Sequence, residues 1–136
     1  MTFVDTNVVV DILEADPNWF RWSRGALATA AADGNLRITH IVLAELNARR
    51  GTAEVVMSRL ADLKLPIDPL DTAIALRAGQ AHGLYRSRGG ERTAILADFL
   101  IGAHAVVRGA ALITRDARRF AGYFPELTII SPESHP

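Results

Sequence analysis

The chain has 136 residues with 15 basic and 15 acidic side chains, so its net charge is zero and any contact with nucleic acid has to come from local patches. Apolar residues make up 49% and charged residues 22%, which is typical of a globular chain, and the length predicts one domain with one core. The absence of cysteine excludes a disulfide framework and thiolate metal sites, and no apolar run reaches membrane-spanning length, so we expect a cytoplasmic protein.

In the N-terminal half, short apolar runs alternate with stretches of helical spacing. Phe3-Val4 predicts a short buried strand that ends at Asp5, and Thr6 or Asn7 is a suitable cap for the helix that follows. The other elements predicted here are a helix over 8–13, a helix from about 19 to Gly34, a strand over 36–39 and helices over 41–49 and 52–64.

The C-terminal half continues this alternation. Prolines close to Ile67 predict that its short strand lies at the edge of the sheet. We then expect a helix over 71–85, a loop over 86–92, a helix from Thr93 to about 108, a strand over 110–113, a turn into a short helix over 114–120 and a strand over 127–130. The polar tail, 131–136, contains two prolines and is expected to fray.

Strands that alternate with helices predict an α/β fold, a three-layer α/β/α sandwich with a short, mainly parallel central sheet. We expect a single domain over residues 1–130. In an open parallel sheet, ligands bind outside the carboxyl ends of the strands. Asp5 and Asp116 each follow a predicted strand, so both are expected at that edge.

Two further carboxylates, Glu45 and Asp98, lie inside apolar runs. Burying an ionised carboxylate without a compensating positive charge is costly. Glu45 has Arg49 at the favourable i, i+4 spacing, and Asp116 is a candidate N-cap for residues 117–120. Asp98 has no basic residue three or four positions away. These acids therefore either pair with distant arginines or bind a cation together.

Taken together, the four acids predict a cluster of oxygen ligands. Hard oxygen ligands without cysteine, and without histidine at metal-ligand spacing, favour Mg²⁺ or Mn²⁺ over Zn²⁺. Carboxylates that converge on one pocket repel each other when no ion is bound. We therefore expect the pKa of at least one of them to be raised.

The order of these motifs resembles that of PIN-domain nucleases, and most closely that of the VapC-type toxins of bacterial toxin–antitoxin pairs. The motifs are Asp5-Thr-Asn7, Glu45 in an apolar helix, Asp98 within 97–103, and the segment 114–120. Each motif is short, but together they span essentially the whole chain, and their order and spacing make the match specific.

The resemblance implies a PIN fold and a metal-dependent endoribonuclease that acts as a toxin. It implies that the catalytic, metal-binding acids are Asp5, Glu45, Asp98 and Asp116. It further implies that Thr6, Asn7 and Thr114 support these acids by hydrogen bonding. The implied cofactor is Mg²⁺, for which Mn²⁺ substitutes. The implied partners are an RNA substrate, a small cognate antitoxin and a second copy of the chain in a homodimer.

Arginines near two of the acids are candidates for contacts with RNA phosphates. Arg86, Arg88 and Arg92 lie in the predicted loop before the helix of Asp98. A second group, Arg115, Arg118 and Arg119, surrounds Asp116. Bare clusters of this kind are more often a solvated surface.

Two other functions stay open at this point. An aspartyl phosphatase also begins with an aspartate at a strand end, but it has a second aspartate two positions later, where this chain has Asn7. The other is a non-catalytic PIN-like domain that binds RNA or acts as a scaffold. The presence of all four acids argues against a loss of catalysis.

Overall fold

The computed structural model describes residues 1–49, 51–89 and 96–136. In these residues a parallel sheet has the strand order β3-β2-β1-β4-β5. The strands are β1 (Thr2–Val4), β2 (Leu36–Thr39), β3 (Ile67–Asp68), β4 (Ala111–Ile113) and β5 (Ile129–Ile130). Each strand coincides with a predicted one, and β3 lies at the edge as the nearby prolines indicated.

The centre of the sheet is also the centre of the core. β1 pairs with β2 through Thr2 and Leu36, and with β4 through Phe3 and Leu112. Phe3 and Leu112 are fully buried, which is expected where helices cover both faces of a parallel sheet.

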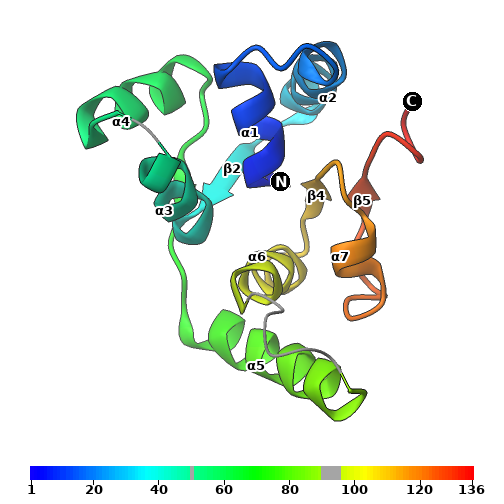
Figure 1. The fold of residues 1–136 in the computed structure, drawn as a ribbon. Coiled ribbons are helices and arrows are strands. Elements are labelled where there is room, and N and C mark those ends of the chain that lie inside the picture. The colour runs from blue at the N-terminus through cyan, green and yellow to red at the C-terminus, as the bar shows by residue number, and fades with distance from the viewer. Residues whose placement is uncertain (50, 90–95) are drawn as a thin grey trace.

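Seven helices in the described residues connect these strands: α1 (Thr6–Leu13), α2 (Phe20–Asp33), α3 (His40–Arg49), α4 (Ala53–Asp62), α5 (Thr72–Ser87), α6 (Leu96–Val107) and α7 (Arg118–Ala121). Right-handed crossovers in this strand order bring α1–α4 to one face of the sheet and α5–α7 to the other (Figure 1). The predicted three-layer α/β/α architecture is therefore confirmed. None of the described helices is long and apolar enough to cross a membrane.

Local signals explain where several helices begin. Thr39 accepts a hydrogen bond from the amide of Val42 and so caps α3. Asp5 itself is the N-cap of α1, with its side chain accepting from the amide of Thr6, so the predicted capping by Thr6 or Asn7 is wrong. The carboxylate at the end of β1 is therefore held by the first turn of α1.

The loop predicted over 86–92 is wrong at its start. α5 continues to Ser87, so Arg86 lies in its last turn and Arg88 is its C-cap residue. The helix ends before Gly89, whose φ of +80° favours glycine. Arg92 and Thr93 lie outside the described residues, as does the predicted start of the following helix.

The C-terminal tail does not fray as expected. Ser131 is buried, and its carbonyl oxygen accepts a hydrogen bond from the amide of His135 at 2.8 Å. The indole nitrogen of Trp22 in α2 donates to the carbonyl of His135 at 2.7 Å. These contacts tie the tail to a helix more than one hundred residues earlier in the chain.

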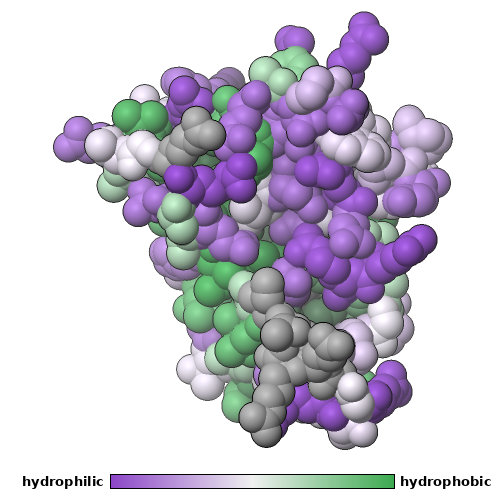
Figure 2. Space-filling view, viewed as in Figure 1, coloured by the Kyte–Doolittle hydropathy of each residue, from purple (hydrophilic) through white to green (hydrophobic). Residues whose placement is uncertain are grey.

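Hydrophilic and hydrophobic side chains occupy different regions of the face shown in Figure 2. Hydrophilic side chains cover most of the region over α1, α2 and α7, whereas hydrophobic side chains gather between α3 and the beginning of α5.

Candidate functional site: an acidic pocket at the end of β1 and β4

The pocket lies where the strand order reverses, between β1 and β4. The amide of Asp5, just after β1, donates to the carbonyl of Ile113 in β4 at 2.9 Å. One residue later, the hydroxyl of Thr114 donates to Oδ2 of Asp5 at 2.7 Å. The carboxyl ends of the two central strands are thus joined around one carboxylate.

Asp5 is almost completely buried, with 1% of the residue exposed. Its Oδ1 accepts from the amide of Thr6 at 2.8 Å, and its Oδ2 accepts from both Thr114 and Arg119. Hydrogen bonds of this kind stabilise the ionised form of a carboxylate and fix its orientation.

The other three predicted acids come from separate elements and are linked to Asp5 through Thr6, Arg119 and Thr114. Glu45 in α3 accepts from the hydroxyl of Thr6 through Oε1 at 2.7 Å. Asp98 lies in the first turn of α6 and has a side chain that is 20% exposed. Asp116 follows β4, and its amide donates to the hydroxyl of Thr114 at 3.1 Å. The cavity formed here has a volume of about 560 Å³ and is lined by Asp5, Thr6, Asn7, Glu45, Asp116 and Arg119, among others.

Arg119 in α7 joins three of the acids. Its Nη2 donates to Oδ2 of Asp5, and its Nη1 donates to Oδ1 of Asp98 at 2.5 Å. Its Nε lies 3.5 Å from Oδ2 of Asp116. The guanidinium of Arg119 therefore lies among three carboxylates. Asp98 pairs with an arginine that is distant in the sequence, which is one of the two alternatives that the sequence left open.

Two local explanations for individual acids are contradicted. Arg49 forms a two-nitrogen ion pair with Glu14, at 3.0 and 3.1 Å, in place of the expected pairing with Glu45. The N-cap of α7 is Ala117, which makes no side-chain capping bond, so Asp116 does not cap this helix.

The pocket changes the ionisation of Asp98. Burial raises the pKa of its carboxyl group, and the negative charges of Asp5 and Glu45 raise it further, while Arg119 acts in the opposite direction. The predicted raised pKa is therefore present, at Asp98. The repulsion indicates that the arrangement of acids favours additional positive charge.

A further acid that lines the pocket, Asp11, was not predicted. It is 1% exposed, accepts from the hydroxyl of Ser23 at 2.7 Å, and pairs with Nε of Arg115 at 2.7 Å and Nη2 at 3.1 Å. The guanidinium carbon of Arg115 also lies 5.2 Å from the ring centre of Trp19. The available signal was the same as for Asp98, a carboxylate among apolar residues with no basic partner at helical spacing.

The remaining predicted residues have different positions. Asn7 accepts from the backbone amide of Arg115 at 3.3 Å through Oδ1, so its bond is to the loop after β4. Neither Arg86 nor Arg88 lines the acidic pocket. Arg115 does line it, although two of its nitrogens are bonded to Asp11. The roles of these arginines in binding RNA stay predictions.

The chemistry of the pocket fits a divalent cation. The acids supply only hard oxygen donors, which suit Mg²⁺ and Mn²⁺, and the nitrogens of Arg119 show that positive charge is stabilised between them. In the described part of the chain, no group of three or more His, Cys, Asp or Glu side chains is already arranged to hold a metal ion. The donor set therefore fits, but Arg119 lies between its members.

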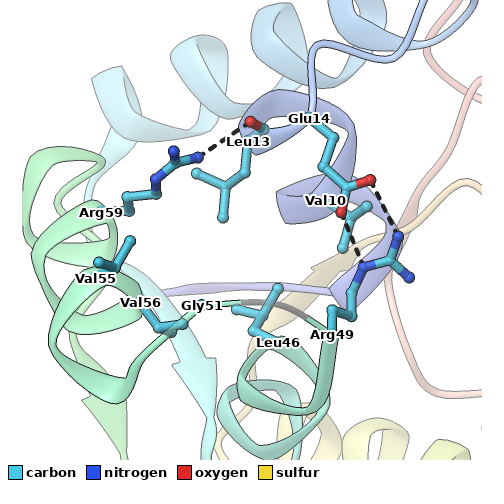
Figure 3. Close-up of a pocket in the computed structure, with 9 residues that line it drawn as sticks. All are labelled: Val10, Leu13, Glu14, Leu46, Arg49, Gly51, Val55, Val56 and Arg59. Atoms are coloured by element: carbon cyan, nitrogen blue, oxygen red, sulfur yellow. Dashed lines mark hydrogen bonds and ion pairs between the residues drawn. The ribbon is translucent and has the colours of Figure 1, made fainter.

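An apolar groove adjoins this pocket (Figure 3). It has a volume of about 510 Å³ and lies between α1, α3 and α4, where it is lined by Val10, Leu13, Glu14, Leu46, Arg49, Gly51, Val55, Val56 and Arg59. Figure 3 shows Arg59 hydrogen-bonded to the carbonyl of Leu13 at one end of the groove and Arg49 paired with Glu14 at the other. Val10, Glu14 and Arg49 also line the acidic pocket, so the two cavities are neighbours that share the Glu14–Arg49 ion pair.

Comparisons with known proteins agree with this fold. VapBC2 from Rickettsia felis, solved with a DNA fragment from its promoter, has 23% identity and a TM-score of 0.76 over 96% of this chain and 97% of that chain. DNA-bound VapBC from Salmonella typhimurium has 24% identity and a TM-score of 0.70 over 96% of each chain. Mycobacterium tuberculosis VapC20, described as a sarcin-ricin loop cleaving toxin, has 17% identity and a TM-score of 0.61 over 91% of this chain and 96% of that chain.

At these identities the three structures establish a common fold. A search of curated proteins finds no match. The model of the PIN domain family matches residues 2–123, which is most of the sequence and includes all four predicted acids. The chain therefore belongs to the PIN-domain family.

Proposed function

We propose that this protein is a metal-dependent endoribonuclease and the toxin of a toxin–antitoxin pair. The observation that carries the proposal is the convergence of Asp5, Glu45, Asp98 and Asp116, from four separate elements, at the reversal of strand order in a PIN-domain chain. The fold likeness to chains of VapBC complexes, and to a toxin described as cleaving the sarcin-ricin loop, supports this choice of activity and substrate.

We propose that the four acids hold Mg²⁺, with Mn²⁺ as a substitute. When bound, such an ion activates water for attack on a phosphodiester and neutralises charge on the phosphate oxygens. The hydrogen bonds from Thr6 and Thr114 orient Asp5 and Glu45 so that their oxygens are fixed before substrate arrives. The carboxylates repel an RNA backbone until their charge is compensated, so RNA binding depends on the ion as well.

Positive side chains near the pocket are proposed to hold the RNA backbone. Among the described residues of the predicted set, Arg115 lines the pocket whereas Arg86 and Arg88 do not. Contacts of Arg86, Arg88 and Arg92 with the RNA backbone are part of the same proposal. Since the net charge is zero, these contacts would give RNA binding a strong dependence on salt.

A cleavage assay on single-stranded RNA tests the activity. Wild-type protein should cleave RNA with Mn²⁺ and stop when a chelator is added. Asp5→Asn and Asp98→Asn should each lower the rate by about 10² or more, because each removes a ligand charge. Asp62→Asn is the matched control, since Asp62 is exposed at the end of α4 and should have no effect. Chelator-resistant cleavage, or wild-type activity in both pocket variants, would reject the proposed nuclease site.

We further propose that the partner is a small antitoxin that places an amphipathic helix in the apolar groove. The groove offers aliphatic side chains from three helices (Figure 3). It shares lining residues with the acidic pocket, so a long basic side chain of the bound helix would reach toward the carboxylates. Charge complementarity thus favours a helix with an apolar stripe and one or two basic residues.

The antitoxin proposal is tested by co-expression with the product of a short reading frame that overlaps or precedes the gene. Val55→Glu should prevent complex formation, because Val55 is 46% exposed and lines the groove. Met57→Glu is the control, since Met57 is 48% exposed on the same helix but does not line the groove. Equal complex formation by both variants would reject the groove as the docking site.

A homodimer is also proposed, and exposed apolar side chains on α5 support it. Large apolar residues are exposed on α5 and just before it. Leu76 is 71% exposed and Leu84 is 41% exposed, and Leu70, two residues before α5, is 40% exposed. Light scattering after gel filtration should give twice the 14.8 kDa chain mass, and Leu76→Asp should shift it to the monomer if α5 forms the interface.

A further inference from the structure

Arg119 is the residue of the acidic pocket that the proposed function leaves without a role. All three of its guanidinium nitrogens face carboxylates: Nη2 contacts Asp5, Nη1 contacts Asp98 at 2.5 Å, and Nε lies 3.5 Å from Asp116. The three acids belong to the end of β1, to α6 and to the segment after β4. One cation is therefore shared by acids that the rest of the fold brings together.

The metal-free pocket needs this cation. Asp5 is 1% exposed, and an ionised carboxylate removed from water requires a countercharge or several hydrogen bonds. Asp5 receives both, from Arg119 and from the donors of Thr6 and Thr114. Arg119 also opposes the effects of burial and of the neighbouring acids, which together raise the pKa of Asp98.

The position of the Arg119 guanidinium is incompatible with a divalent ion bound to the same carboxylates. A guanidinium that contacts Asp5 and Asp98 occupies the oxygens that a metal would use, and its charge repels an ion a few ångströms away. A divalent ion also supplies twice the charge to four carboxylates. Occupation by the two cations is therefore mutually exclusive.

Arg119 is able to leave without disturbing the core. It lies in the four-residue helix α7, and its side chain is 30% exposed. Its guanidinium carbon lies 5.0 Å from the ring centre of Phe120, which is itself fully buried and holds α7 in place. A rotation of the Arg119 side chain alone would open the pocket and carry its charge toward solvent.

We propose that Arg119 is an internal competitor of the metal ion: it holds the carboxylates together in the metal-free chain and is displaced toward solvent when the ion binds. The inference rests on the metal site of the proposed function. It predicts that the affinity for the ion is set by the cost of displacing Arg119 as well as by the four acids.

Calorimetric titration with Mn²⁺ tests the proposal without any RNA. Arg119→Gln should bind Mn²⁺ at least about 10-fold more tightly than wild type, because an opposite charge in direct contact shifts the affinity of a carboxylate for a cation by a factor of this size. Arg118→Gln is the matched control. Arg118 is the neighbour of Arg119, is exposed, and makes no ion pair with any described residue. The substitution removes the same charge, and screening by solvent should limit its effect on Mn²⁺ affinity to less than about 3-fold.

Thermal unfolding supplies the second measurement. Without metal, Arg119→Gln should melt below Arg118→Gln, because Asp5 and Asp98 lose their countercharge, and saturating Mn²⁺ should raise the melting temperature of Arg119→Gln more than that of wild type. Arg119→Lys keeps the charge without the three-way contact and should bind Mn²⁺ with intermediate affinity, which preserves the test if the glutamine variant is too unstable to titrate.

Two results would overturn the inference, and they differ in what else they reject. If wild type binds Mn²⁺ and Arg119→Gln binds it equally or more weakly, Arg119 does not compete and the proposed metal site is unaffected. If neither protein binds Mn²⁺, the metal site of the proposed function fails together with the inference.

Discussion

The hydroxyl of Thr114 donates a hydrogen bond to Oδ2 of Asp5 over 2.7 Å, and these two residues directly follow the central strands β4 and β1. The same oxygen of Thr114 accepts the amide of Asp116 at 3.1 Å. One buried hydroxyl therefore fixes the position of two of the four acids. Its contribution to the pocket is positioning rather than direct ligation.

Replacing this hydroxyl should weaken metal binding while the fold is kept. Thr114→Val has nearly the same volume but removes the bond to Asp5, and the loss of such a supporting bond should lower Mn²⁺ affinity by about 10–100-fold. Thr114→Ser keeps the hydroxyl and should restore the affinity. Calorimetry on both variants decides the point, and equal affinities for Thr114→Val and wild type would show that Asp5 does not depend on this bond.

The contact between α6 and α7 depends on the absence of a side chain at Gly102. A Cβ at this position would lie 2.5 Å from Cε2 of Phe124 and 3.1 Å from Cδ1 of Phe120, both of which are buried. Gly102→Ala should therefore lower the free energy of unfolding by about 1–3 kcal/mol through overpacking. It should also separate Asp98 from Arg119, because these residues lie on the two helices that are pushed apart.

Gly79→Ala provides the control for this prediction. Nothing lies within 4 Å of a Cβ at Gly79 in α5, so alanine should be neutral or stabilise the protein by up to about 1 kcal/mol. Urea unfolding of the two variants compares them directly. If Gly102→Ala is as stable as Gly79→Ala, the close packing of α6 against α7 is not required.

Arg115 should be important for stability, in addition to its proposed contact with the RNA backbone. Its guanidinium pairs with Asp11, which is 1% exposed, so Arg115→Ala leaves a buried carboxylate without its countercharge. We expect the free energy of unfolding to fall by about 2–4 kcal/mol. Arg118→Ala, at an exposed position nearby, should stay within about 0.5 kcal/mol of wild type. A stable Arg115→Ala protein with weakened RNA binding would instead support the predicted phosphate contact.

His104 should make the protein sensitive to mild acid. It is fully buried, its Nε2 lies 2.7 Å from Oδ2 of Asp68, and its Nδ1 has no hydrogen-bond partner among the residues that the structure describes. Burial lowers the pKa of His104 below its usual 6.5, although the carboxylate of Asp68 opposes the shift. A protonated ring would also bury an unpaired donor at Nδ1.

The sign of the pH effect follows from this lowered pKa. As pH falls through 6.5, the unfolded chain takes up a proton at His104 that the folded chain does not, so the free energy of unfolding decreases until the folded pKa is reached. The slope contributed by one proton approaches about 1.4 kcal/mol per pH unit. Urea unfolding between pH 7.5 and about 5 should show this decrease in the free energy of unfolding for the wild-type protein. His40→Gln, which replaces an exposed histidine, should show the same decrease, and His104→Gln should show a smaller one. Parallel curves for the three proteins would contradict the assignment.

Much of the fold was predictable because its signals are local. Short apolar runs marked all five strands of the described sheet, and prolines beside Ile67 correctly identified an edge strand. The end of α5 was misplaced because Arg86 and Ser87 tolerate a helix, and only Gly89, with its positive φ, stops it. The tail was misjudged because its bond to Trp22 is a long-range contact.

In the candidate site, too, local signals were predictable and long-range contacts were not. Asp5 and Asp98 were identifiable because a carboxylate inside or at the end of an apolar run needs a compensating partner. The partner itself was not identifiable, since Arg119 is 114 positions from Asp5 and 21 from Asp98. The pairing exists only because the fold brings α7 against the ends of β1 and α6.

The location of Mn²⁺ in crystals of the wild-type protein, read from its anomalous scattering, is the most direct test of a metal-binding pocket in this PIN domain. We expect one anomalous peak within coordination distance of the carboxylates of Asp5 and Asp98, with the side chain of Arg119 turned toward solvent. Crystals soaked in saturating Mn²⁺ that show no peak there, and in which Arg119 still bridges Asp5 and Asp98, would contradict it.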